Sequence, residues 1–314
     1  MTLHNHDHAP HDHNHAHGHS HGPANYNTAF AVGIALNTIF VVVESVYGYL
    51  SHSLALMADA GHNLSDVLGL LLAWGATYLA TRKPSRKFTY GLRSSSILAA
   101  LANAVLLLVA IGGIAWEAIS RFNDPQPVGA STIMIVAGIG ILINGATALL
   151  FMSGRKSDLN LKGAYLHMLS DAVVSVGVVI AGLIISYTAL NWIDPVVSLV
   201  ICAVIVWGTW GLLKDSVKLA LNAVPESIDS AAVLTHLKTQ KGVFEVHDLH
   251  IWAMSTTEIA LTAHLIIKGG HPGDAFLDKL SHELERDFGI HHATLQIEVG
   301  DHSVTCRLAP DEVV

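Results

Sequence analysis

Long apolar runs alternate with short polar segments over the first two thirds of the chain. Each run is long enough for a helix to cross the hydrocarbon core of a bilayer, which takes about 20 residues. The pattern therefore predicts an α-helical membrane protein. We expect six spanning helices at residues 28–50, 54–80, 97–119, 132–152, 161–187 and 192–213.

The pattern changes after residue 213, where shorter segments replace the apolar runs. We expect helices at 228–239 and 273–288 and strands at 243–252, 258–267 and 293–299. This helix–strand–strand–helix–strand order predicts a small α+β domain. The chain thus divides into a polar N-terminal segment at 1–25, a membrane domain at 26–213 and a cytoplasmic domain at 214–314 that ends in a short tail.

Composition agrees with an integral membrane protein, since 51% of the residues are hydrophobic and 13% are charged. From Lys214 onward 15 acidic residues face 8 basic ones, which is −7 of the net charge of −8. Such an acidic domain argues against nucleic acid as a partner and is compatible with cations. The first 25 residues hold no apolar segment, so we expect no cleavable signal peptide. Cys202 and Cys306 offer no disulfide framework.

Basic residues predict how the membrane domain is oriented. Eight of the nine Lys and Arg before residue 214 lie in two loops, at Arg82, Lys83, Arg86, Lys87, Arg93, Arg155, Lys156 and Lys162. Loops rich in Lys and Arg stay in the cytoplasm. We therefore expect a multi-pass membrane protein with both termini in the cytoplasm.

Two of the apolar runs contain the same polar pattern, His-x-Leu-Ser-Asp, at His62–Asp66 and His167–Asp171. Residues four apart lie on one face of a helix, so each run presents one imidazole and one carboxylate to a common point. Two nitrogens and two oxygens suit tetrahedral zinc, and two Asp plus one divalent cation sum to zero charge. Without metal the carboxylates need protons, so exchange of metal for protons has the form of a transport cycle. The alternative is two His–Asp pairs that only pack the helices together.

Two further acidic residues lie in the predicted spans. Asp59 falls three residues before His62, on nearly the same face, and is a third ligand, an acceptor for an imidazole N–H or a carboxylate of the outer vestibule. We favour the last two roles. Glu44 lies near the outer end of the first span, where it is either solvated or part of the pathway.

Histidines are concentrated at both ends of the chain. Nine of the 21 occupy the first 22 residues, in a low-complexity segment that we expect to be disordered and to collect metal for the transporter or to bind it only weakly. In the C-terminal domain, adjacent strands are expected to bring His247, His264 and Glu298 together as a second metal site.

These features together resemble the cation diffusion facilitator family, and within it the bacterial zinc, cadmium and cobalt efflux members. The most specific pieces are the two His–Asp pairs, the segment 53–62 (Ser-Leu-Ala-Leu-Met-Ala-Asp-Ala-Gly-His) and the segment 246–252 (Val-His-Asp-Leu-His-Ile-Trp). The loop at 81–91 departs from some relatives, since it holds no His or acidic residue, and we expect no metal site there. We expect this basic loop to face the acidic C-terminal domain or anionic lipid headgroups.

The resemblance implies a homodimer in the inner (cytoplasmic) membrane that exchanges cytosolic metal for external protons by alternating access. The transport site of each protomer would consist of His62, Asp66, His167 and Asp171. The resemblance also implies a ferredoxin-like cytoplasmic domain that dimerises and binds regulatory metal through His247, His264 and Glu298, with His291 as a further ligand. Zinc is then a substrate and a regulatory ion, and no cofactor is expected.

Two other functions compete with transport. An intramembrane zinc metallohydrolase needs an open coordination position and a general base, but Asn63 and Met168 stand where the His-Glu-x-x-His pattern has its Glu, and four protein ligands would exclude water. A membrane-bound metal sensor that uses the C-terminal domain alone would leave the two intramembrane pairs without a role. We therefore expect a secondary transporter and not an enzyme.

Overall fold

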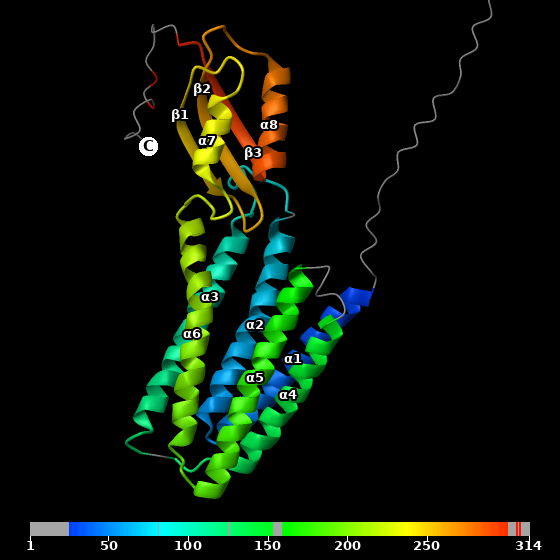
Figure 1. The fold of residues 1–314 in the computed structure, drawn as a ribbon, viewed down its shortest axis with the longest axis vertical. Coiled ribbons are helices and arrows are strands. Elements are labelled where there is room, and N and C mark those ends of the chain that lie inside the picture. Colours follow the sequence, from blue (N-terminus) through cyan, green and yellow to red (C-terminus); the bar gives the residue numbers. More distant parts are fainter. Residues whose placement is uncertain are drawn as a thin grey trace, which may run out of the picture.

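The computed structural model describes residues 25–80, 82–124, 126–152, 159–300, 306 and 308, so the histidine-rich segment lies outside the described part of the chain. Within that part, six long helices form a bundle and a small domain follows them (Figure 1). The helices are α1 (Asn25–Leu50), α2 (Leu54–Ala80), α3 (Ser95–Ser120), α4 (Ala130–Met152), α5 (Leu159–Thr188) and α6 (Ile193–Ala220). The sequence prediction of six helices is confirmed.

Helix α6 is longer than predicted and ends at Ala220 instead of residue 213. Hydropathy marks the end of the apolar run, but the polar turns from Lys214 onward continue the same helix toward the C-terminal domain. By length and composition α3, α4, α5 and α6 each suffice to cross a membrane. Helix α2 is equally long, and its polar residues Asp59, His62 and Asp66 lower its hydropathy.

A buried carboxylate of α6 joins the ends of α2 and α6 that lie away from the C-terminal domain. Asp194 accepts hydrogen bonds from the Ser53 hydroxyl at 2.5 Å and from the Leu54 backbone N–H at 2.7 Å, and Ser53 caps α2 by accepting from the Leu56 N–H at 3.2 Å. The first N–H groups of a helix have no partner within the helix, so these bonds satisfy them. Asp194 thereby fixes the start of α2 beside α6.

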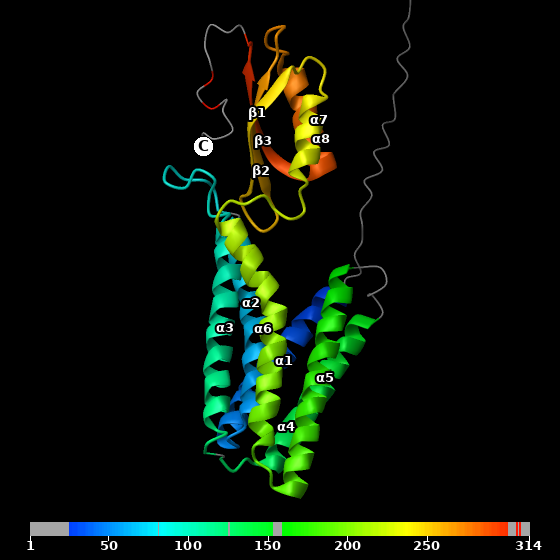
Figure 2. The same ribbon diagram turned by 60° about the vertical axis from the view of Figure 1, so that its left-hand side comes forward.

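Helices α5 and α6 are close together at that same end and diverge toward the C-terminal domain, as two views agree in showing (Figures 1 and 2). Small residues allow the close approach of α4 and α5 on the other side of the bundle. A side chain at Gly140 would meet Phe40 of α1 and Ser175 of α5, and one at Gly182 would meet Met134 of α4. The divergence leaves room between α2, α5 and α6 for a polar site.

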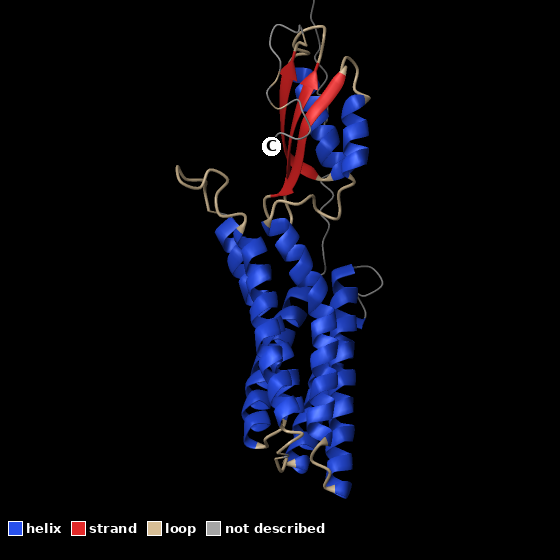
Figure 3. Ribbon diagram, turned by 90° about the vertical axis from the view of Figure 1, so that its left-hand side faces the viewer, coloured by secondary structure: helices blue, strands red, loops and turns tan. Residues whose placement is uncertain are grey.

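The C-terminal domain has the predicted element order: α7 (Ser230–Lys238), β1 (Glu245–Ala253), β2 (Ile259–Ile266), α8 (Asp274–Phe288) and β3 (Ile290–Glu298). The sheet order is β1-β2-β3, with β1 antiparallel and β3 parallel to β2. Figure 3 shows both helices on one face of the sheet. They cover a core formed by Val233, Leu237, Val246, Leu261, Leu265, Leu280, Leu284 and Ile290.

Strand β3 begins three residues earlier than the predicted start at residue 293. Gly289 ends α8 in the left-handed conformation at φ 68°, which glycine adopts without steric cost, and the chain enters the strand at once. Helix α7 begins later than predicted because Asp229 caps it, accepting hydrogen bonds from the N–H groups of Ala231 and Ala232.

The β1–β2 turn of this domain contacts the start of α3. Arg93 forms an ion pair of 2.6 Å with Glu258, the Ser94 hydroxyl donates to the Met254 carbonyl at 3.1 Å, and the Thr256 N–H donates to the Ser96 hydroxyl at 3.1 Å. These contacts join the residues at the start of α3 to the C-terminal domain. In the preceding loop, the centroid of the Tyr90 ring lies 5.6 Å from that of His292 in β3. The environment of the basic residues in the loop 81–91 stays a prediction.

Candidate metal centres

The two His–Asp pairs predicted from the sequence meet between α2 and α5. Nε2 of His167 lies 3.0 Å from Oδ2 of Asp66, and Nε2 of His62 lies 3.4 Å from Oδ1 of Asp171, so each imidazole contacts the carboxylate of the other helix. One ligand atom from each of the four residues lies within 4.8 Å of the others. Two nitrogens and two oxygens thus surround one point, as tetrahedral zinc requires.

The polar atoms of this cluster are not satisfied by the protein itself. Nδ1 of His62 and Oδ2 of Asp171 are buried and have no hydrogen-bond partner. A buried polar atom without a partner costs free energy, so its presence in a native structure calls for an explanation such as a bound ion. A cavity of about 340 Å³ lies beside the four residues and extends along α6 to Leu212. The donors and the space both fit a metal ion.

The exposure of the four side chains decreases with distance from the C-terminal domain. His167 and Asp66 are 38% and 33% exposed, His62 is 24% exposed and Asp171 is 3% exposed. In α2 the more exposed residue, Asp66, is the one farther from the 51–53 turn, and in α5 the more exposed residue, His167, is the one farther from the 189–192 turn. Both turns lie at the end of the bundle away from the C-terminal domain (Figure 1). The cluster is therefore accessible from the side of the C-terminal domain and closed toward the other end.

Asp59 and Glu44 lie outside this group of four. Asp59 lines the same cavity, yet it is 1% exposed and accepts a hydrogen bond from the Ser175 hydroxyl at 3.3 Å. Glu44 is completely buried and accepts a hydrogen bond from the Asn63 amide at 3.2 Å. Of the two possibilities for Glu44, solvation is wrong, because the side chain is buried and contacts Asn63 of α2; a role in the pathway stays a prediction.

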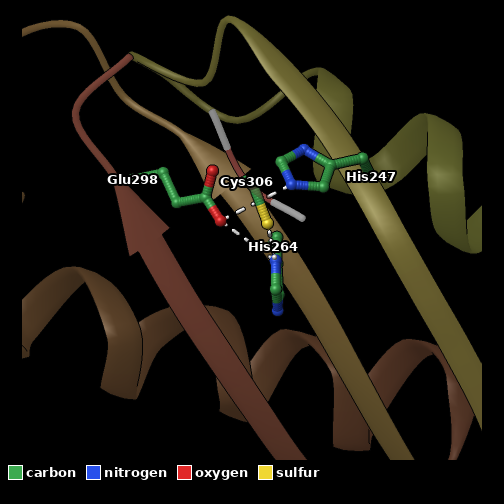
Figure 4. Close-up of side chains that lie close together, drawn as sticks. All are labelled: His247, His264, Glu298 and Cys306. Carbon is green, nitrogen blue, oxygen red and sulfur yellow. Dashed lines mark hydrogen bonds and ion pairs between the residues drawn. The ribbon is translucent and has the colours of Figure 1, made fainter. Parts of the chain in front are cut away.

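The second predicted cluster forms on the face of the sheet opposite α7 and α8. Its members come from three strands and the tail: His247 of β1, His264 of β2, Glu298 of β3 and Cys306 (Figure 4). Nδ1 of His264 lies 3.0 Å from Oε1 of Glu298 and 3.5 Å from Sγ of Cys306, and Nε2 of His247 lies 3.5 Å from the same Glu298 oxygen. The cross-strand pairing of His247 with His264 places the two rings together.

A β-bulge between His247 and His250 adds a supporting carboxylate. Asp248 has φ 51°, a left-handed conformation that Asp tolerates better than most residues, and the register of β1 shifts there. As a result Oδ2 of Asp248 lies 3.3 Å from Nε2 of His264, while Oδ1 lies 2.8 Å from His250. A carboxylate that accepts from one imidazole nitrogen directs the other nitrogen toward a metal. Asp248 thus orients Nδ1 of His264 toward Glu298 and Cys306.

The donors of this second cluster fit a transition metal, and neither ring nitrogen of His247 has a hydrogen-bond partner although both are buried. Burial raises the pKa of Glu298, but hydrogen bonds from Cys306 and Gln296, together with His247 and His264, outweigh that effect and leave the pKa below its ordinary value. The carboxylate is therefore ionised at neutral pH. Two imidazoles, a carboxylate and a thiol form a ligand set that suits zinc or cadmium.

Two residues need separate mention. Sequence analysis missed Cys306 as a partner of this cluster, because the residue follows the last strand and no helix or strand periodicity relates it to His247, His264 and Glu298. His291 is an exposed residue of β3 outside both groups of close ligands found in the described part of the chain. Its role as a further ligand stays a prediction, as does metal collection by the histidine-rich segment.

Comparison with known proteins agrees with both halves of the structure. The family model for the cation efflux transmembrane domain matches residues 30–219, and that for the cytoplasmic domain of cation efflux proteins matches residues 225–299. The zinc transporter ZitB of Escherichia coli is 38% identical over 282 residues, covering 89% of each chain. The cadmium, cobalt and zinc/H⁺-K⁺ antiporter of Bacillus subtilis is 34% identical over 277 residues, covering 87% of this chain and 89% of the relative.

A solved structure also matches the C-terminal part. It is the metal-bound C-terminal domain of the CzcD transporter from Cupriavidus metallidurans, 33% identical, covering 23% of this chain and 99% of that domain, with a TM-score of 0.22. The family assignment rests on the transmembrane family model and on the relatives that match over most of their length. The chain belongs to the cation efflux family, the cation diffusion facilitators that its motifs resemble.

Proposed function

We propose that this protein exports zinc, and also cadmium or cobalt, from the cytoplasm in exchange for protons. One observation carries the proposal: His62, Asp66, His167 and Asp171 converge between α2 and α5, with orphaned polar atoms beside a cavity. Two ionised Asp and a divalent cation leave the buried site neutral, and without the metal the same groups need protons. Zinc, cadmium and cobalt are also the ions in the names of the relatives.

The direction of transport follows from the orientation. The loop between α2 and α3, rich in Lys and Arg, lies at the end of the bundle that carries the C-terminal domain, and this supports a cytoplasmic location for that end and for both termini. The more exposed ligands, His167 and Asp66, lie toward the same end, so this conformation is suited to accept metal from the cytosol. Export then requires α5 and α2 to rock until the site opens at the other end.

Proton exchange is the driving step of the proposed cycle. A His side chain has a reference pKa of about 6.5, so small changes in its surroundings move it between charged and neutral forms near physiological pH. Metal displaces protons from His and Asp on the cytoplasmic side, and incoming protons displace the metal on the outer side. The inward proton gradient thereby drives metal export.

The C-terminal domain has a separate role in this proposal. His247, His264 and Glu298, joined by Cys306, hold a regulatory zinc ion on the sheet, and the domain pairs with a second copy in a homodimer. No chemistry on the metal is required, since four protein ligands leave no position for an activated water. A metallohydrolase therefore has no support here, and the relatives are transporters.

The decisive test is zinc flux in sealed proteoliposomes with an imposed pH gradient. Intact protein is expected to transport zinc at a rate that follows the gradient, and Asp171→Ala is expected to lose more than about 100-fold, since a metal ligand is removed. Asp124→Ala, the same change at an exposed residue after α3, is the matched control and should leave flux unchanged. Equal flux in Asp171→Ala and the intact protein, or flux indifferent to the pH gradient, would remove the intramembrane site or the antiport from the proposal.

A further inference from the structure

We infer that Asp194 of α6 is a positioning residue for transport, which holds the start of α2 against α6 as the fixed side of an outer gate. The outer end is here the end of the bundle away from the C-terminal domain (Figure 1). The inference rests on the proposed antiport, because a site open to both sides of the membrane would let metal run down its own gradient. It gives a task to a buried carboxyl group that binds no metal in that cycle.

Hydrogen bonds join two successive turns of α6 to the first residues of α2. Besides the bonds from Ser53 and Leu54 described above, Asp194 accepts one from the Ala55 N–H at 3.4 Å. One turn further along α6, the Ser198 hydroxyl donates to the Leu54 carbonyl at 3.3 Å. Asp194 is 1% exposed, and Ser53 and Ser198 are completely buried, so water cannot replace these bonds. Bonds to a carboxylate are also about twice as strong as those between neutral groups. We call this group of bonds the α2–α6 clamp.

The α2–α6 clamp lies directly beyond the closed end of the metal cavity. In each of three helices one residue lines that cavity closest to the outer end: Asp59 of α2, Val174 of α5 and Ile201 of α6. Ala55 and Val178 stand one helical turn beyond the first two, and both belong to the same packed apolar core as Ile201. These three apolar side chains, here called the outer plug, separate the cavity from the outer end. Because the clamp includes the Ala55 N–H, it fixes one wall of this plug.

Helix α5 forms the other wall of the outer plug through apolar contacts. Near its outer end, the Ser186 hydroxyl donates to the Leu183 carbonyl at 2.8 Å and the Thr188 hydroxyl donates to the Ile184 carbonyl at 2.7 Å, both within α5 itself. A movement of α5 away from the plug breaks none of these bonds. A movement of α2 away from α6 would instead leave a carboxylate and buried N–H groups without partners, which costs free energy for each group. The outer gate therefore opens on the side of α5, while α2 keeps its place beside α6.

The turn that precedes α2 is held to α3 as well. Arg121, just after the end of α3, donates a hydrogen bond to the His52 carbonyl. At the outer end α2, α3 and α6 are thus joined by polar contacts. Two of the four proposed metal ligands lie on α2 and two lie on α5. The movement of α5 that opens the gate therefore also pulls the two halves of the metal site apart, which favours release of the metal at the outer end.

The test compares zinc accumulation in sealed proteoliposomes between the intact protein and Asp194→Asn, with a pH gradient imposed. The amide has nearly the shape of the carboxyl group but places an N–H donor where a carboxylate oxygen accepts from Ser53 or Leu54. We expect the zinc affinity and the initial rate of zinc uptake to stay close to those of the intact protein. Steady-state accumulation is expected to fall at least about fivefold, because the weakened gate lets zinc leak back. Asp124→Asn, at an exposed residue after α3, is the matched control.

A second measurement detects opening of the gate directly. Ala55→Cys places a thiol in the outer plug, in a background of Cys202→Ser and Cys306→Ser that removes both native cysteines. A thiol reagent that does not cross membranes is added on the outer side of right-side-out membrane vesicles. We expect it to label this thiol at least about fivefold faster when Asp194→Asn is also present. If Asp194→Asn does not fold, Ser198→Ala takes its place, with a smaller effect in the same direction, because it removes one bond of the clamp.

The outcomes separate this inference from the antiport. Accumulation and labelling equal to those of the intact protein would overturn the inference and leave the antiport intact. If affinity and initial rate fall as much as accumulation does, Asp194 has only a structural role and the inference is also overturned. Absence of gradient-driven accumulation in the intact protein would instead overturn the antiport itself, and the labelling of the outer plug would then still decide whether the clamp closes the outer end.

Discussion

The two candidate metal centres are built on different kinds of structure. The intramembrane cluster takes two ligands from each of two helices, α2 and α5, which no hydrogen-bonded ladder connects. In the C-terminal cluster His247, His264 and Glu298 come from three adjacent strands whose backbones pair by hydrogen bonds. A small shift between α2 and α5 would pull the first cluster apart, while the sheet holds its ligands at fixed spacing. The first arrangement suits release of a metal and the second suits retention.

The polar contacts that hold the histidines in place also differ between the two clusters. At the sheet, Asp248 fixes the ring of His264 from the far side, and the core of the domain backs the strands. In the membrane each imidazole contacts the Asp of its own helix at 3.7 Å and the Asp of the other helix at 3.4 Å (His62) or 3.0 Å (His167). Ligands that support each other can exchange metal for protons together, because loss of one contact weakens the rest. The comparison predicts that substitutions at the two sites affect different properties.

The largest difference is expected from one substitution made at both centres. His62→Asp changes the intramembrane set to one nitrogen and three oxygens, which favours harder ions such as Mn²⁺ over zinc. We expect zinc flux to fall at least about tenfold and zinc-to-cadmium preference to weaken, since a nitrogen ligand is lost. His264→Asp, the same change on β2, should leave transport selectivity as it is. Competition flux with zinc, cadmium and manganese measures both variants, and an unchanged zinc-to-cadmium preference in His62→Asp would mean that His62 is not a ligand.

The intramembrane centre could be predicted because helix periodicity is local. Four residues between His62 and Asp66, and again between His167 and Asp171, suffice to place each pair on one face, whatever the rest of the fold does. The closeness of His247 and His264 also followed from the order of the strands. What escaped prediction depends on tertiary contacts: the bulge at Asp248, the cap that Asp194 provides for α2, and the burial of Glu44. Each of these involves elements far apart in sequence.

A smaller effect is expected from removing the charge that supports the sheet site. Asp248→Asn keeps the size of the side chain but weakens the bond that orients His264, and outer partners of this kind are worth about 10- to 100-fold in metal affinity. The loss should appear as weaker zinc binding by full-length protein that also carries Asp171→Ala, so that the intramembrane site is silent. Asp278→Asn, an exposed Asp on α8, is the matched control. Zinc affinity equal to that of the control would show that the bulge does not serve the metal.

Cys306→Ser is expected to change selectivity more than affinity. The thiolate is the softest ligand of the C-terminal cluster, and its replacement by a hydroxyl should lower binding of cadmium relative to zinc by a few fold. Cys202→Ser alters the other cysteine, which is buried between α3 and α6 away from both clusters, and should not change that ratio. Competition between the two metals in the same Asp171→Ala background measures the effect. If Cys306→Ser binds cadmium and zinc in the same ratio as the protein that keeps Cys306, then Cys306 is not a ligand. The site would then have only the three ligands from the sheet.

The smallest effect concerns the connection between the two centres. Arg93 and Glu258 are 38% and 33% exposed, and an ion pair this accessible to solvent contributes at most about 0.2–1 kcal/mol to stability, toward the low end because of screening. Even so, the pair joins the β1–β2 turn to the loop residue just before α3, and β1 and β2 carry His247 and His264. We therefore expect Arg93→Ala to leave zinc affinity at both centres unchanged and to weaken the response of transport to zinc bound at the C-terminal domain.

The measurement is zinc flux as a function of cytoplasmic-side zinc, compared between Arg93→Ala and Arg86→Ala, an exposed arginine of the same loop. A ligand alters a distant site only through a contact whose free energy differs between the two states, so a weak contact can transmit only a small effect. If Arg93→Ala flattens the response and Arg86→Ala does not, zinc at the C-terminal cluster regulates transport at the intramembrane cluster through the β1–β2 turn. If both variants respond as the intact protein does, the Arg93–Glu258 pair is not needed for this coupling. The hydrogen bonds of Ser94 and Ser96 then suffice to couple the C-terminal domain to α3, or the coupling passes through α6, which leads directly into the C-terminal domain.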